Sequence, residues 1–173
     1  DAVVLLHDQQ RGERMLADLG RAARLDADVR GIPARVLPLA LWHTASLGLE
    51  MWLTAIAYGA SQVWVLTTDD DAPQYRTALA EQMAVAEAML QGLGYRGTHL
   101  RQWHVRDARD LAALDAALQD GPALGVRRAA GYAVQAEKRA TLELALAHLA
   151  EHAPTPPRMP IPLPAAGAPL GAL

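Results

Sequence analysis

Cysteine is absent from all 173 residues of the sequence. Its absence excludes disulfide bonds, thiolate chemistry and an iron–sulfur cluster bound by this chain's own cysteines. The sequence also lacks an apolar segment long enough to cross a bilayer, and no basic stretch followed by an apolar one opens it. With a formal net charge of −3, it lacks the basic excess typical of proteins that bind nucleic acids or anionic membranes. We therefore expect a cytoplasmic protein that binds neither.

The motifs of several common ligand and catalytic sites are missing as well. The loop after the first predicted strand, residues 7–12, contains neither GxGxxG nor GxxxxGK, so an ordinary site for NAD, FAD or ATP is not expected. Ser46 has no GxSxG context, and the six histidines show no HExxH spacing. These patterns indicate no enzyme activity.

Composition indicates one globular domain followed by a segment of different character. Hydrophobic residues make up 51% and charged residues 20% of the chain, which is typical of a soluble domain. Seven of the 11 prolines lie in residues 152–173, which predicts extended, polyproline-like chain. We expect an α/β domain over residues 1–151 and a tail over 152–173 that either lies on the domain or links it to a following module. The start at Asp1, without an initiator methionine, predicts that the chain is part of a longer polypeptide.

The stretch from residue 43 to residue 75 is the centre of the expected fold. A mostly apolar helix is predicted from His43, because its polar residues recur at three- and four-residue steps and form one narrow stripe. After a turn at Gly59 and Ala60, residues 63–66 form an uninterrupted apolar run, typical of a parallel strand covered on both faces. An acidic loop, residues 67–71, leads into the next helix. This arrangement is half of a doubly wound α/β sheet, in which ligands usually bind at the loop after a central strand.

The flanking segments complete the same pattern. Strands are predicted at residues 2–6, 34–39, 98–105 and, as a short fifth strand, 124–130. Pro38 lacks an N–H donor and places the second strand at or near an edge. Helices are predicted over residues 15–23, 72–93, 107–118 and 137–151, with a capping box of Asp71 and Gln74 before the second and Asp107 capping the third. The fold class is therefore α/β: a three-layer sandwich with a mostly parallel sheet of four or five strands in a flavodoxin-like order.

The candidate site lies at the carboxyl edge of this sheet, where the ends of parallel strands meet. Its residues are His7, Asp8, His43, Thr68, Asp69, Asp70 and Tyr75. Carboxylates there would suit a divalent cation such as magnesium, and the threonines would suit the phosphate of FMN. However, acidic residues before a helix are also favoured by the helix dipole without any ligand, and aspartates repel a phosphate. We favour helix capping, with flavin or divalent-metal binding as the alternative.

Three segments carry a resemblance to a known family: AIAYGASQVWVL, the acidic loop ending at Tyr75, and the helix closing with LQGLGY. They resemble the delta, iron–sulfur subunit of methyl-viologen-reducing hydrogenase and the related domain fused to heterodisulfide-reductase components. The resemblance implies a [2Fe-2S] cluster, with one cysteine before the first helix and a CHPGDCHY-like loop after the strand. Aligned on Gly59, the cysteine positions hold His43, Thr68 and Pro73 here. That cluster is therefore not expected in this chain.

A closer resemblance covers nearly the whole chain. The opening DAVVLLHD, the LWHTASLGLEMWL and EKRATLELALAHL helices and the LPAAGAPLGAL ending resemble the central region of bacterial multi-module 4Fe-4S ferredoxin-type proteins. There, a cysteine-free domain lies between ferredoxin modules. The resemblance implies a non-catalytic scaffold or docking domain of an iron–sulfur electron-transfer protein. Its 4Fe-4S clusters would lie in flanking modules, and its partners would be those modules and redox proteins. A homodimer is a further expectation.

Overall fold

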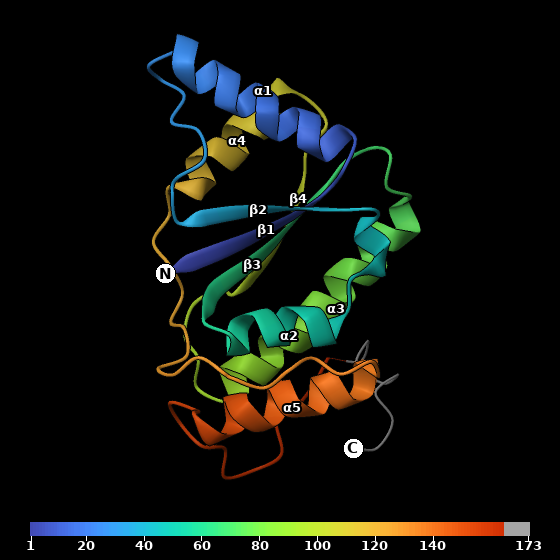
Figure 1. The fold of residues 1–173 in the computed structure, drawn as a ribbon, viewed down its shortest axis with the longest axis vertical. Coiled ribbons are helices and arrows are strands. Elements are labelled where there is room, and N and C mark those ends of the chain that lie inside the picture. The colour runs from blue at the N-terminus through green and yellow to red at the C-terminus, as the bar shows by residue number, and fades with distance from the viewer. Residues whose placement is uncertain (165–173) are drawn as a thin grey trace.

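Four parallel strands form the central sheet in the computed structural model, which describes residues 1–164 (Figure 1). They are β1 (Ala2–Asp8), β2 (Val36–Leu41), β3 (Ala60–Thr67) and β4 (Leu100–His104). Their order is β2-β1-β3-β4, which confirms the predicted flavodoxin-like arrangement. Every residue of β3 is buried, as its uninterrupted apolar run predicts for a strand covered on both faces. Pro38 lies on β2 at the edge of the sheet, also as predicted.

Helices cover both faces of the sheet and make the three layers visible in Figure 1. On one face lie α1 (Arg11–Leu25) and α4 (Ala108–Leu118), and on the other lie α2 (Leu49–Ala57) and α3 (Pro73–Gly92). The last helix, α5 (Lys138–Glu151), packs against α2. Each face has its own apolar core: Trp64, Leu66 and Leu114 belong to the first, and Trp52 and Leu53 to the second. No helix within residues 1–164 combines the length and apolar character needed to cross a lipid bilayer.

The predicted helix from His43 is wrong at its start. The chain first makes a short 3-10 turn, η1 (Thr44–Ser46), and α2 begins only at Leu49. Gly48, with extended backbone at φ −146° and ψ 177°, separates the two. The polar residues expected to form one stripe therefore belong to two elements, and His43 caps η1 instead of lying on α2.

The predicted fifth strand at residues 124–130 does not form among the described residues. The N–H of Leu124 donates to the carbonyl of Arg96 at 2.9 Å, and the N–H of Ala130 donates to the carbonyl of Ala57 at 2.8 Å. These partners lie in the turn before β4 and at the end of α2, so the segment makes single bonds to two separate places instead of a ladder along β4. The sheet therefore has four strands in the described part of the chain.

The helix starts give one correction and one confirmation. The capping box of Asp71 and Gln74 is wrong: α3 begins after Ala72 without a side-chain cap, and the Asp71 carboxylate turns back toward Thr68. Pro73 is the first residue of α3, where its missing N–H costs nothing. Asp107 caps α4 as predicted, since its carboxylate accepts the N–H groups of Arg109 and Asp110.

The described part of the proline-rich tail, residues 152–164, lies against the end of α3. The N–H of Thr155 donates to the carbonyl of Leu93 at 3.2 Å, and Ile161 packs beside Gly92 and the second core. Residues 165–173 lie outside the described part of the chain. The division into a domain over 1–151 and a linking tail over 152–173 stays a prediction.

Candidate functional site

Asp8, at the end of β1, caps the start of α1. Its Oδ1 accepts the N–H groups of Gln10 at 2.7 Å and Arg11 at 2.8 Å, and its Oδ2 accepts the N–H of Gly12 at 2.8 Å. A Cβ at Gly12 would lie 2.7 Å from Oδ2, so the carboxylate fits only against a glycine. Three donors of the first turn, which the helix itself leaves unpaired, are thereby satisfied. Both oxygens of Asp8 are occupied by the fold.

Asp71, the last residue of the acidic loop, is buried and closes the loop on itself. Its Oδ2 accepts the N–H of Thr68 at 2.8 Å, and its Oδ1 accepts the hydroxyl of Thr44 in η1. Thr68 is fully buried, and its Oγ1 accepts the N–H of Asp70 at 3.3 Å. The loop after β3 is thus fastened to the turn before α2 by one carboxylate.

Asp69 and Asp70 point outward and face basic side chains from two other elements. Oδ2 of Asp69 lies 3.7 Å from Arg11, and its Oδ1 lies 3.1 Å from Nε2 of His104 at the end of β4. Oδ1 of Asp70 lies 3.5 Å from Arg11. The two outer aspartates of the loop therefore contact Arg11 of α1 and His104 of β4, and no described contact joins them to Asp8. The sequence patterns did not indicate Arg11 or His104. The one signal for these residues was their position beside the ends of β1 and β4, the two strands that flank β3.

The two histidines and the tyrosine of the candidate site have separate roles. His7 is buried, and its Nδ1 lies 2.9 Å from the carbonyl of Asp8. Nδ1 of His43 accepts the N–H of Ala45 at 2.9 Å, and its ring meets the half-exposed Tyr75 edge-on at 5.9 Å. No described contact joins His7 to His43. These residues lie at the carboxyl edge of the sheet, but they do not converge on one point.

The cavity beside the Thr44–Asp71 hydrogen bond is small. A cavity of about 10 Å³ lies between η1, the acidic loop and the first turns of α3, with Thr44, Asp71 and Tyr75 in its lining. A single water needs on the order of 10–15 Å³, so neither an isoalloxazine ring nor a cluster fits there. Among residues 1–164, no group of three or more His, Asp or Glu side chains is placed to hold a metal ion.

The positions expected to align with cysteines of the resembling hydrogenase subunit lie within two residues of those that line this small cavity. His43 precedes η1, Thr68 follows β3, and Pro73 opens α3. The three segments are joined through the Thr44–Asp71 hydrogen bond and the contact between His43 and Tyr75.

A second buried polar cluster, which the sequence patterns did not indicate, lies at the opposite end of β4. Nδ1 of the fully buried His99 lies 3.1 Å from Oε1 of Glu87, and its Nε2 lies 3.1 Å from the carbonyl of Leu124. Oε2 of Glu87 accepts the N–H groups of His99 and Leu100, each at 3.0 Å. Since both ring nitrogens face acceptors, the two bonds together need a proton on each nitrogen.

The pKa of the Glu87 carboxyl follows from these contacts. Burial alone would raise it. The hydrogen bond and positive charge of His99, with the two backbone N–H groups, outweigh burial and hold this pKa below the ordinary 4.5. The cluster joins α3, β4 and the segment that replaces the predicted fifth strand.

Comparison with known proteins adds no identification. No family model matches the chain, and no curated protein matches it. Family and function therefore depend on the residues described above.

Proposed function

We propose that this chain is a non-catalytic scaffold or docking domain of an iron–sulfur, 4Fe-4S ferredoxin-type electron-transfer protein and holds no cluster itself. One observation carries the proposal: the side chains of the domain fill the carboxyl edge of its own sheet. The Asp8 oxygens cap α1, those of Asp71 bind Thr68 and Thr44, and the outer aspartates face Arg11 and His104. An edge whose polar groups are already paired has little to offer a ligand.

The electron-transfer context comes from the resemblance and from where its positions lie. His43, Thr68 and Pro73 stand in for the cysteines of the related hydrogenase subunit, and their three segments meet at one place. In this proposal the domain keeps the backbone arrangement of a cluster-binding domain, and the hydrogen bonds of Asp71 stabilise that arrangement without metal. The 4Fe-4S clusters lie in flanking ferredoxin modules, and those modules and redox proteins are the partners.

A flavin- or divalent-metal-binding domain is the alternative. It is favoured by the gathering of acidic residues at the ends of β1 and β3, which in a doubly wound fold is the usual ligand edge. Against it stand the small cavity and the occupied carboxylate oxygens. Magnesium or FMN that raises the melting temperature in a saturable way supports this alternative.

The test begins with the chain purified without oxygen and then incubated with iron and sulfide. We expect a colourless, iron-free protein whose melting temperature does not change with magnesium or FMN. A stoichiometric cluster or flavin spectrum contradicts the proposal. In the longer polypeptide that the proposal requires, replacing the cysteines of a CxxCxxCxxxCP run removes iron, whereas deleting residues 1–151 leaves the iron content of each chain unchanged. A coding sequence without such runs refutes the electron-transfer context.

A further inference from the structure

The two edges of the sheet differ in what they offer to another strand. On β2, alternate residues bond to β1: the N–H of Val3 donates to the carbonyl of Arg35 at 2.9 Å, and the N–H of Gln9 donates to that of Leu41 at 3.0 Å. The residues facing outward are therefore Val36, Pro38 and Ala40. The Val36 N–H already donates to the carbonyl of Pro33, and Pro38 has no N–H. One outward donor is left, so β2 is closed to a further strand.

The edge at β4 is open. The N–H of Val63 donates to the carbonyl of His99 at 2.7 Å, and that of Val105 donates to the carbonyl of Thr67 at 2.9 Å, so the residues facing outward are Leu100, Gln102 and His104. Glu87 takes the N–H of Leu100. Within residues 1–164, the amides of Gln102 and His104 and the carbonyls of all three outward residues have no hydrogen-bond partner.

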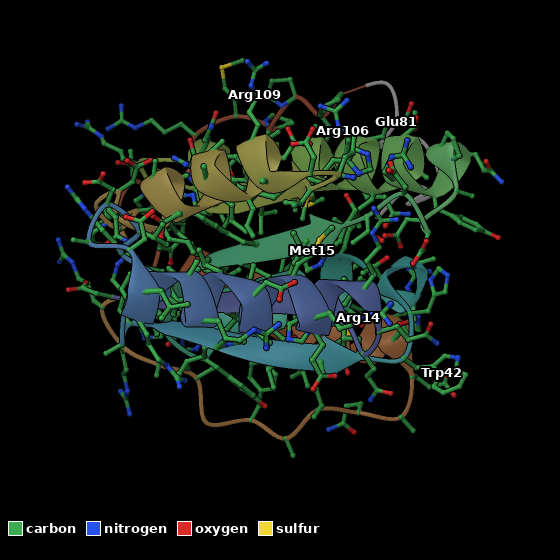
Figure 2. All side chains as sticks on the ribbon, turned by 90° about the horizontal axis from the view of Figure 1, so that it is seen from above. Arg14, Met15, Trp42, Glu81, Arg106 and Arg109 are labelled. Atoms are coloured by element: carbon green, nitrogen blue, oxygen red, sulfur yellow. The ribbon has the colours of Figure 1, made fainter. Side chains whose placement is uncertain are left out.

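An accessible hollow lies beside this edge. It has a volume of about 520 Å³ between α3 and β4, and its lining includes Ala80, Glu81, Gln102 and His104. Figure 2 shows Glu81 and Arg106 on this side of the molecule, with Trp42 on the opposite side. The exposed side chain at residue 80 is only a methyl group, so another backbone can come close. The described chain therefore leaves room for a strand along β4.

The open ladder of β4 complements itself. A two-fold axis through Gln102 sets Gln102 opposite the same residue of a second copy, in antiparallel register. Each Gln102 N–H then donates to the other Gln102 carbonyl, and each His104 N–H donates to the Leu100 carbonyl of the second copy. The Leu100 N–H needs no partner, because Glu87 already accepts it. The free donors of one copy meet the free acceptors of the other.

The side chains on one face of β4 are complementary in the same register. Arg101 lies opposite Trp103 of the second copy, on the same face of the sheet. Within one copy the guanidinium of Arg101 already lies 5.2 Å above the ring of Trp64, whose centroid is 5.8 Å from that of Trp103. Cross-strand pairing places a second cation beside an indole face, which is an attractive contact, and sets no like charges directly opposite.

From the free ladder, its self-complementary register and the Arg101–Trp103 pairing, we propose that two copies of this chain join through antiparallel β4 strands into one continuous sheet. The interface is isologous, with the axis at Gln102. This dimer needs no cluster and no ferredoxin module, so its test is independent of the test of the proposed function.

The test compares one substitution at the two edges. Gln102→Pro removes an outward N–H that makes no bond within the described chain, so folding should be preserved. Ala40→Pro makes the same change at the outward amide of β2. By sedimentation velocity over a wide range of concentration, we expect the 18.5 kDa wild-type chain and Ala40→Pro to sediment as dimers. Gln102→Pro should raise the dissociation constant about thirtyfold, because the two lost hydrogen bonds, one from each Gln102 N–H, each contribute about 1 kcal/mol.

Amide hydrogen exchange on the wild-type chain provides a second measurement that needs no substitution. We expect the peptide containing residues 101–105 to become more protected as concentration rises, while the β2 peptide does not change. A wild-type chain that stays monomeric, a dimer that survives Gln102→Pro, or an Ala40→Pro monomer overturns the proposal. Exchange at residues 101–105 that does not change with concentration also overturns the proposal. This measurement decides the question even if Gln102→Pro fails to fold.

Discussion

Removal of the Glu87 carboxylate should destabilise the protein more than any surface carboxylate does. Its side chain is 16% exposed and accepts hydrogen bonds from His99 Nδ1 and from two backbone N–H groups at the start of β4. Glu87→Ala leaves all of these donors buried without an acceptor. Each unsatisfied donor costs about 1–3 kcal/mol, and shared relaxation reduces the sum. We therefore expect a loss of about 3–5 kcal/mol in the free energy of unfolding.

Glu87→Gln removes the negative charge of the side chain but keeps a hydrogen-bond acceptor. The amide oxygen still accepts the backbone N–H groups, and the amide nitrogen can donate to a His99 ring that carries a single proton on Nε2. The expected loss is about 1–2 kcal/mol, because a neutral hydrogen bond replaces a charged one. Glu143→Gln is the matched control: this glutamate pairs with Arg139 on the exposed face of α5, so its replacement should change stability by less than about 0.5 kcal/mol.

The pH dependence has a definite sign. Because the folded-state pKa of Glu87 is lowered, its contribution to stability is present above the unfolded-state pKa and is lost as the pH falls through the folded-state value. The stability difference between the wild type and Glu87→Gln should therefore be largest near neutral pH and shrink below about pH 4.5. Urea unfolding followed by circular dichroism at several pH values measures it. A difference that does not vary with pH, or an alanine variant as stable as the control, refutes the reasoning.

Two further predictions concern the carboxyl edge and the turn before β3. Asp71→Asn should lower the free energy of unfolding by about 1–3 kcal/mol, because a donor replaces one buried oxygen that accepts the Thr68 N–H or the Thr44 hydroxyl. Asp70→Asn, on the exposed side of the same loop, should lower it by less than about 0.5 kcal/mol. Equal losses in urea titrations would contradict the assignment. Gly59→Ala should cost about 1–2 kcal/mol, because Gly59 has φ of 107°, which side chains rarely adopt. A Gly59→Ala variant with the melting temperature of the wild type would contradict this prediction and show that the turn relaxes.

The elements that the sequence predicted well are those whose pattern depends on burial or on backbone chemistry. The apolar run of β3 corresponds to a strand buried on both faces, and Pro38 lies on an edge strand. Asp107 caps α4, because a side chain can reach amides two and three residues on without help from the rest of the fold.

Predictions failed where a distant partner decides the structure. Asp71 has the sequence context of a helix cap, but Thr44, far from it in the chain, provides a competing donor. Residues 124–130 have the composition of a strand, yet their amides find partners in turns. The residues of the candidate site lie at the carboxyl edge of the sheet for topological reasons, whereas the contacts of its aspartates with Arg11 and His104 depend on tertiary structure that no local pattern contains.

The proline on β2 has a consequence for how far association can continue. A molecule whose sheet had two open edges could add copies indefinitely and grow into a fibre, because such contacts do not close on themselves. Here the β2 edge has lost two of its three outward donors, to Pro38 and to the bond between Val36 and Pro33, while the β4 edge is the one that pairs with its own copy in the proposed dimer. In the proposed dimer only the two β2 edges would face the solvent, so association would stop at two copies.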